Sequence, residues 1–127
     1  MKLYAMESVI FAENFDALVE WYQRVLGFRV MQLYEDEYHY CVLENETGIK
    51  IGIASAIEMS VTPGDRKNNT VVLQFQVEDV PRFFEYLQEH GGKISFGPSF
   101  DKKDHFWYGG FTDIEGNPFW LVDKNCP

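Results

Sequence analysis

Two stretches of the chain, 65 positions apart, share one hydrophobic pattern: Ser8–Val30 and Leu73–Ser95. Each begins with a short run of alternating apolar residues, which predicts a strand, and continues with apolar residues at helical spacing. Asn14 and Asp79 mark the helix starts, because a short side-chain oxygen can accept hydrogen bonds from the free amides of a first turn. Gly27 supplies a left-handed exit from the first helix. The pattern therefore predicts strand, helix and strand, twice.

The rest of each half reads as further strands. The apolar helix stripes consist of Phe15, Leu18, Val19, Tyr22, Val25 and Leu26 in the first half, and Val80, Phe83, Phe84 and Leu87 in the second. The later strands are predicted at Phe28–Tyr34, Tyr38–Glu44 and Ile49–Ala54, then Lys93–Phe96, His105–Thr112 and Pro118–Val122. A polar loop is predicted at Gly97–Asp104. The expected fold class is α+β, with the order βαβββ occurring twice.

The chain length sets the domain organisation. With 127 residues, a single domain with a hydrophobic core is expected. Repeat one occupies about residues 1–57 and repeat two about residues 70–127. Between them lies a linker, residues 58–69, that is rich in turn-forming residues.

The alternation within the strands separates two faces of each sheet. The face expected to cover the helices carries Ile10, Ile49, Ile51, Ile53, Leu73, Phe75, Val77, Phe119 and Leu121. The opposite face carries Glu7, Val9, Phe11, Lys50, Gly52, Ala54, Val72, Gln74, Gln76, Pro118, Trp120 and Val122. If the two sheets curve together, this second face lines a cup, with the helices outside, in which a small molecule would sit.

Two face assignments concern the middle strands. In the first half, either Tyr38 and Tyr40 or His39 and Cys41 line the cup, and the alternation leaves both alternatives open. In the second half, Tyr108 is expected to face the cup if Phe111 packs under a helix.

Composition and charge narrow the class of partner. The net charge of −9 argues against nucleic acid or an anionic membrane surface, which would require a basic patch, and is compatible with a cationic ligand. No apolar run is long enough to span a membrane and the first residues lack a signal-peptide core, so a cytoplasmic location is expected. Cys41 and Cys126 lie far apart in the sequence and are expected to be free thiols.

Two segments resemble a known family. "VEWYQRVLGF" (Val19–Phe28) is similar to the helix-to-strand motif of the vicinal oxygen chelate superfamily, and "TDIEGNPFWLV" (Thr112–Val122) resembles its closing turn and strand. That superfamily includes glyoxalase I, bleomycin-resistance proteins, fosfomycin-resistance enzymes and extradiol dioxygenases. The resemblance implies a tandem βαβββ fold over nearly the whole chain. It does not select an activity, because the fold hosts many.

The resemblance also implies where a metal would be held. Metalloenzymes of this superfamily place ligands on the first and last strand of each half, and the matching positions here are Glu7, Gly52, Val72 and Trp120. Only Glu7 offers an oxygen donor, whereas a catalytic zinc site uses about three protein ligands. Binding without a metal or other cofactor is therefore expected.

The sequence thus predicts a metal-independent protein that binds a small aromatic or cationic molecule and acts as a homodimer, as superfamily members commonly do. The candidate ligand-binding residues are Glu7, Phe11, Gln74, Tyr108 and Trp120. Two alternatives stay open. One is a glyoxalase- or dioxygenase-like enzyme with Glu7 as base and ligands not recognised in the sequence. The other is a structural or interaction module. The three histidines show no ligand spacing and are expected to be structural.

Overall fold

The computed structural model describes all residues, 1–127. The chain forms two compact units, Met1–Gly64 and Asp65–Pro127, and each is described by itself. The boundary between them falls inside the predicted linker, residues 58–69. The grouping of the two repeats into one domain stays a prediction.

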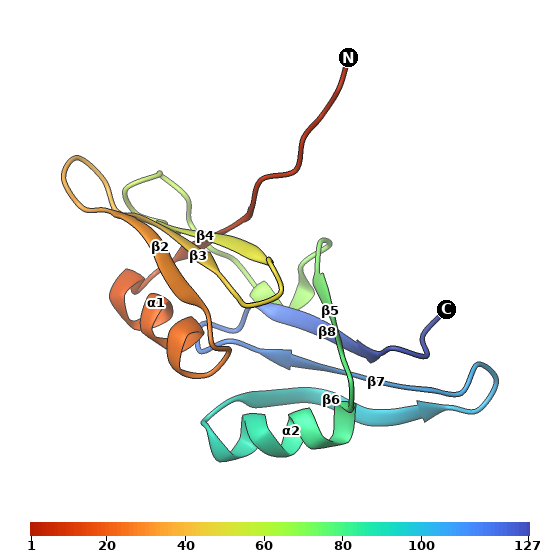
Figure 1. Ribbon diagram of the computed structural model, residues 1–127. Helices are drawn as coiled ribbons and strands as arrows, with labels where there is room; N and C mark the ends of the chain where they lie inside the picture. The colour runs from red at the N-terminus through yellow and green to blue at the C-terminus, as the bar shows by residue number, and fades with distance from the viewer. The chain divides into compact units, whose positions relative to one another are not determined.

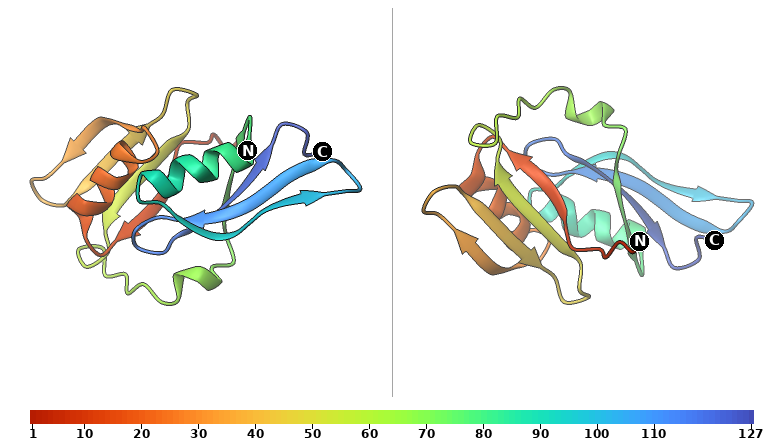
Figure 2. Two further views of the ribbon diagram at one scale, coloured as in Figure 1. Left: turned by 90° about the horizontal axis from the view of Figure 1, so that it is seen from below. Right: turned by 90° about the horizontal axis from the view of Figure 1, so that it is seen from above.

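Unit 1 is a four-stranded sheet with one helix. Its elements are β1 (Ser8–Ala12), α1 (Phe15–Arg24), β2 (Arg29–Tyr34), β3 (Tyr40–Glu44) and β4 (Lys50–Ser55). The strand order is β1-β4-β3-β2; β1 and β4 run parallel and the other neighbours antiparallel. Figures 1 and 2 show α1 against one face of this sheet.

Unit 2 repeats the plan. After the short 3-10 helix η1 (Arg66–Asn68) come β5 (Leu73–Val77), α2 (Val80–Glu89), β6 (Lys93–Asp101), β7 (Phe106–Thr112) and β8 (Pro118–Asp123). The strand order is β5-β8-β7-β6, again with one parallel pair, β5 and β8. The predicted α+β class and the duplicated βαβββ order are confirmed.

Both helices begin where the sequence predicts. The Asn14 side-chain oxygen accepts the Ala17 amide at 3.2 Å, and the Asp79 carboxylate accepts the Arg82 amide at 3.0 Å. Each acceptor satisfies an amide that has no partner within its own helix. Two short polar side chains thus fix the first turns of both helices.

The core of each unit lies between its helix and the covered face of its sheet. Ile51 and Ile53 in unit 1, and Phe119 and Leu121 in unit 2, are at most 1% exposed, as their alternation predicts. Trp21, which the predicted stripe omits, is also buried. Its position between Leu18 and Val25 widens the apolar face of α1 beyond a strict i, i+3, i+4 pattern.

The prediction of a polar loop at Gly97–Asp104 is wrong. β6 continues through this segment to Asp101, and only a short turn separates it from β7. A Gly-Pro pair is typical of the end of a strand. β6 is an edge strand, however, so one side of it pairs with no neighbour and the amide that Pro98 lacks is not required there. The register of β6 with β7 shifts between Phe96 and Ser99, where Gly97 and Pro98 lie.

The segment between the repeats makes specific contacts. Glu58 accepts the His39 backbone amide at 3.0 Å, and Arg66 reaches the turn between β7 and β8. No helix of the chain is both long and apolar enough to cross a membrane.

Candidate ligand pocket

The strand register of unit 2 places the predicted residues on one open face. Cross-strand partners share a face, so Gln74, Trp120 and Gly110 form one row and Gln76, Val122 and Tyr108 form the next. The rings of Phe75, Phe119 and Phe111 lie on the opposite face, and Phe111 packs against Phe83 of α2 at 5.9 Å. The conditional prediction that Tyr108 is on the open face is therefore confirmed.

This open face contains a pocket of about 310 Å³. Its wall is largely apolar and contains four aromatic residues: Phe96, Phe106, Tyr108 and Trp120. Gln74 and Asp101 add an amide and a carboxylate to the wall. The volume is at the lower end of the range for small-molecule sites, about 300–1,000 Å³.

Two ring pairs form the wall. Phe96 of β6 meets Trp120 edge to face, with centroids 6.5 Å apart and an interplanar angle of 84°. Phe106 and Tyr108, two residues apart on β7, have centroids 5.9 Å apart. The Phe96 ring lies where a Cβ on Gly110 would stand. A glycine on β7 is thus what lets Phe96 reach across the sheet toward Trp120.

Asp101 is the only charged residue of the pocket wall. Its Oδ1 accepts the backbone amides of Lys103 and Asp104, each at 2.9 Å, at the start of the turn between β6 and β7. These two bonds fix the carboxylate in place and engage one of its oxygens. A negatively charged carboxylate is therefore held in the wall of a pocket that contains four aromatic residues.

The open face of unit 1 has a different character. The register places Val9 beside Gly52, and Phe11 beside Ala54, which in turn pairs with Tyr40. Tyr40 is therefore on the open face, while Cys41 is buried on the helix side. This answers the question that the alternation left open for the middle strand, since Tyr40 rather than Cys41 shares a face with Phe11.

Glu7 and Tyr40 form a polar pair over Gly52. The Tyr40 hydroxyl donates to the Glu7 carboxylate at 2.8 Å, and a Cβ on Gly52 would collide with both groups. Burial, together with the Glu7 carboxylate, raises the pKa of Tyr40 to about 12. Tyr40 is therefore a neutral hydrogen-bond donor at physiological pH. Lys50, on the same strand as Gly52, lies opposite Glu44 of β3.

The residues at the superfamily's metal positions do not fit a metal site. Gly52 and Val72 have no side-chain donor, and the indole of Trp120 offers an N–H but no lone pair for a metal. Nowhere in the chain do three or more of His, Cys, Asp or Glu gather as ligands would. No metal-assisted step is therefore derived for this chain.

The cysteines and histidines have local surroundings that suit structural roles. Cys41 and Cys126 are free, and burial raises the pKa of the Cys41 thiol to about 11, which leaves it protonated and unreactive. His39 Nδ1 lies 2.7 Å from Glu58, and this hydrogen bond raises the pKa of the imidazole. His90 stacks on Tyr86, with ring centroids 4.1 Å apart, at the end of α2.

Three of the five predicted site residues, Gln74, Tyr108 and Trp120, line one pocket. The other two belong to unit 1: Glu7 lies just before β1 and Phe11 within it. The five residues predicted from the sequence do not include the pocket residues Phe96, Phe106 and Asp101. Phe106 could have been found from its alternation with Tyr108. Assigning Asp101 requires β6 to be one long strand, and assigning Phe96 requires the space that Gly110 leaves for its ring.

Comparison with known proteins identifies relatives over most of the chain. A family model described as "Glyoxalase/Bleomycin resistance protein/Dioxygenase superfamily" matches residues 5–121. The uncharacterized protein YraH of Bacillus subtilis (strain 168) is 32% identical over 112 residues, which cover 82% of this chain and 83% of that protein.

Solved structures agree in fold. A member of the same superfamily from Sphaerobacter thermophilus DSM 20745 superimposes with a TM-score of 0.79 at 16% identity, covering 97% of this chain and 98% of that one. The fosfomycin resistance protein FosX of Listeria monocytogenes superimposes with a TM-score of 0.73 at 12% identity, covering 97% and 95%. At such low identity these structures indicate a shared fold and leave the activity open.

Proposed function

Since the chain belongs to the Glyoxalase/Bleomycin resistance protein/Dioxygenase superfamily, we propose that it is a metal-independent binding protein for a small aromatic or cationic molecule. The observation that carries the proposal is the aromatic pocket of unit 2, which has one carboxylate in its wall and no basic residue. Gln74, Tyr108 and Trp120 are proposed as ligand-binding residues.

The pocket favours a flat apolar ligand. Trp120 is 53% exposed, although its strand neighbours Phe119 and Leu121 are each only 1% exposed. An exposed indole beside other rings offers a stacking surface, and a cation over its face adds about 0.5–2 kcal/mol. Asp101 and the net charge of −9 favour a cation further, mainly through its rate of association.

Glu7 and Phe11 are proposed as ligand contacts of unit 1. The Glu7 carboxylate, which accepts the Tyr40 hydroxyl, lies just before β1, the strand that contains Phe11. A carboxylate at this place suits an amine or hydroxyl group on a ligand, since both can donate a hydrogen bond to it. A homodimer in the cytoplasm is the proposed form of the protein, in keeping with the expectation from the sequence.

A matched probe series tests the proposal. 1-Naphthylmethylammonium, 1-naphthalenemethanol and 1-naphthoate share one ring system and differ in charge. Calorimetric titration is expected to give saturable binding of the cation, weaker binding of the alcohol and the weakest binding of the anion, because Asp101 repels a carboxylate. Absence of saturable binding by all three compounds would contradict the proposal.

A pair of variants tests the location of the site. Trp120→Ala removes an aromatic ring from the pocket wall. It is expected to raise the dissociation constant of 1-naphthalenemethanol about tenfold, equal to ~1.4 kcal/mol of binding free energy. Trp107→Ala is the matched control, since Trp107 is also exposed but packs against Phe100 and is not part of the pocket wall. Equal effects of the two substitutions would place the site elsewhere. Glu7→Gln, measured with the ammonium probe, tests the proposed contact of unit 1 separately.

A second candidate function is supported by the Glu7–Tyr40 hydrogen bond, which holds a carboxylate in a defined position for use as a base. Such an enzyme would require an electrophile to stabilise an enediolate or a similar intermediate. Metal analysis of the purified protein separates the two candidates. Stoichiometric metal that is lost in the Glu7→Ala variant would favour the enzyme and overturn the binding protein.

A further inference from the structure

A second cavity belongs to unit 1 and lies where the chain turns after β4. Its volume is about 570 Å³, within the range of small-molecule sites, about 300–1,000 Å³. Glu13, at the junction of β1 and α1, forms one side, and residues between Ala56 and Pro63 form the other. This cavity shares no residue with the pocket of unit 2, and none of the five residues predicted from the sequence to bind a ligand is in its wall.

Backbone hydrogen bonds hold the two sides of this cavity in place. The Ala56 amide donates to the Ala12 carbonyl at 2.8 Å, which joins the turn after β4 to the end of β1. Within the turn, the Val61 amide donates to the Ala56 carbonyl at 2.9 Å. Figure 2 shows this turn as a tight curl beside the end of β1. The cavity is therefore preformed, and a ligand does not have to order a loop in order to bind.

A side chain of the same turn attaches it to the sheet at a second place. Glu58 accepts the His39 backbone amide at 3.0 Å and lies 2.7 Å from the ring nitrogen Nδ1 of His39. Because His39 comes directly before β3, this contact joins the turn to the start of that strand. Glu58 is not in the cavity wall, so Glu13 is the only charged residue there.

Ser60, in the cavity wall, has a backbone conformation that residues other than glycine rarely adopt. Its φ is 57°, in the left-handed region. Its amide donates to the Ile57 carbonyl at 3.2 Å, which closes the turn around it. Strained residues of this kind are found preferentially at ligand sites and other functional positions. The strain at Ser60 is thus an observation, separate from the cavity itself, that favours a binding role.

The side chains of the wall indicate the chemistry of a ligand. Glu13 supplies a negative charge, and the hydroxyl groups of Ser60 and Thr62 supply further acceptors of hydrogen bonds. An ammonium group has three N–H donors and can contact all three side chains, whereas Glu13 repels an anion. None of the wall residues is aromatic, and its larger apolar residues are Ile57, Val61 and Pro63. The wall therefore suits an aliphatic body rather than a ring that requires stacking.

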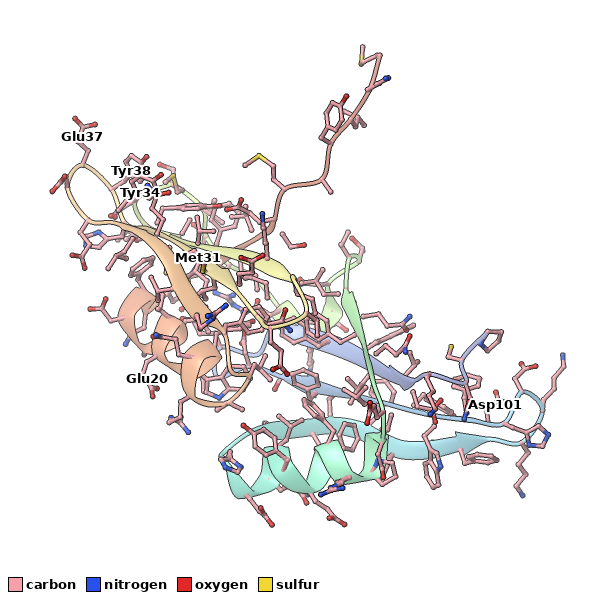
Figure 3. All side chains as sticks on the ribbon, viewed as in Figure 1. Glu20, Met31, Tyr34, Glu37, Tyr38 and Asp101 are labelled. Atoms are coloured by element: carbon pink, nitrogen blue, oxygen red, sulfur yellow. The ribbon has the colours of Figure 1, made fainter.

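We propose that this cavity is a second small-molecule site, which binds an aliphatic primary amine in its ammonium form. Glu13 pairs with the ammonium group, Ser60 and Thr62 accept its other N–H groups, and the aliphatic part lies against Ile57. The unit 2 pocket instead has four aromatic residues and a carboxylate from Asp101, close to the turn of the β6–β7 hairpin (Figure 3). The inference is independent of the ligand proposed for that pocket.

A matched series of compounds tests the location and the chemistry of the site. Cyclohexylmethylammonium, cyclohexanemethanol and cyclohexanecarboxylate share one aliphatic ring and differ in charge. The backbone amide signals of Ile57, Ser60 and Val61, followed in a two-dimensional nitrogen–proton spectrum, are expected to move saturably with the ammonium compound. The alcohol is expected to bind about tenfold more weakly and the carboxylate not to bind, because Glu13 attracts only the cation. Movement of the Trp120 indole signal alone would place the amine in the unit 2 pocket and overturn the proposal.

A pair of charge-removing variants tests the role of Glu13. Glu13→Gln keeps the size of the side chain and is expected to raise the dissociation constant of cyclohexylmethylammonium about tenfold. Glu78→Gln is the matched control and is expected to leave it unchanged. Glu78 directly precedes the helix cap Asp79 as Glu13 precedes Asn14, and both glutamates are exposed, but Glu78 is not part of this cavity. Equal effects of the two variants would mean that only the net charge attracts the amine.

A third variant fills the cavity. Thr62 is exposed, so Thr62→Trp places a large side chain in the wall without disturbing the core. It is expected to abolish the saturable movement of the Ile57 and Val61 signals, while circular dichroism checks that the fold is kept. Saturable binding that Thr62→Trp leaves unchanged would overturn the proposal, as would equal effects of the two glutamine variants.

Discussion

The two units share a backbone plan but differ in where a glycine stands on the open face. In unit 1 the glycine is on the last strand: Gly52 lies between Val9 and Val42. In unit 2 the equivalent last-strand position is Trp120, and the glycine is one strand over, at Gly110. The space beside each glycine is filled differently, by Tyr40 and Glu7 in unit 1 and by the Phe96 ring in unit 2.

This difference shows how one duplicated sheet carries two kinds of surface. A missing Cβ on β4 admits a hydroxyl and a carboxylate, which gives a polar pair. A missing Cβ on β7 admits a phenyl ring, which gives an aromatic wall around Trp120. The strand order is the same in both units, and the register of β3 with β4 matches that of β7 with β8. The chemistry therefore follows from residue size at two neighbouring positions.

The largest effect is expected from the turn that closes unit 2. Arg66 donates to Asn117 at 2.7 Å and to Glu115 at 3.0 Å, and the Arg66 and Glu115 side chains are each only 10% exposed. Arg66→Ala is expected to lower the free energy of unfolding by about 3 kcal/mol, because it leaves a largely buried carboxylate without the guanidinium that pairs with it. Urea unfolding followed by circular dichroism measures this loss.

The control for Arg66 is an exposed ion pair in unit 1. Glu20 contacts Arg24 at 2.9 Å, with both side chains more than half exposed. Glu20→Ala is expected to cost about 0.5 kcal/mol or less. Similar losses of unfolding free energy in Arg66→Ala and Glu20→Ala would contradict the claim that burial makes the Arg66–Glu115 pair the stronger of the two.

A smaller effect is expected from adding a methyl group at the glycines of β7. A Cβ at Gly109 would stand 2.5 Å from Phe84, which is buried in the core, so Gly109→Ala is expected to cost about 1–3 kcal/mol. A Cβ at Gly110 would meet Phe96, which is 42% exposed and can swing away. Gly110→Ala should therefore cost less stability but alter naphthalenemethanol binding. A larger loss of stability for Gly110→Ala would reverse this assignment of faces.

The polar pair of unit 1 predicts a pH dependence. The pKa of Tyr40 is raised from 10.0 to about 12, so the folded state keeps the neutral phenol more strongly than the unfolded state does. This contribution is fully present below pH 10 and is lost as the pH rises toward 12. Tyr40→Phe is expected to cost about 1 kcal/mol at neutral pH and to remove this part of the alkaline loss. Identical alkaline profiles for the two proteins would contradict the Tyr40–Glu7 bond.

The smallest effect is expected from His39, which lies at the surface beside Glu58. The hydrogen bond to Glu58 raises the pKa of His39 above 6.5, so its contribution to stability is fully present below that pH. The contribution is lost as the pH rises through the folded-state value. His39→Gln should flatten a slight decline in melting temperature above pH 6.5, and a decline that persists unchanged would contradict the pairing.

The sequence predicts the parts of the fold that depend on local pattern. Asn14 and Asp79 mark the helix starts, and the alternation of Ile51 with Ile53 identifies the covered face. The prediction of a loop at Gly97–Asp104 is wrong because the structure of this segment depends on its place in the sheet. Pro98 reads as a break because its tolerance on β6 depends on the strand being at an edge, which the sequence does not show.

The candidate site was predicted in part for a similar reason. Gln74, Tyr108 and Trp120 could be found because each follows the period of its own strand. The contact between Glu7 and Tyr40 joins residues far apart in the sequence and depends on the space above Gly52. Asp101 lies in the segment Gly97–Asp104, whose composition predicts a loop, so its place in the pocket wall does not follow from the sequence. The periodicity of a single strand does not predict contacts between side chains on different strands, because these contacts depend on how the strands pair.

The most direct test of the central claim is a two-dimensional nitrogen–proton spectrum of the indole groups, recorded while 1-naphthylmethylammonium is added. The chain has three tryptophans: Trp21 in the core, Trp107 outside the pocket wall and Trp120 within it. Saturable movement of the Trp120 signal, with the Trp21 and Trp107 signals unchanged, is the predicted result. A spectrum in which the Trp107 signal moves while Trp120 stays fixed, or in which none of the three moves, would contradict the account.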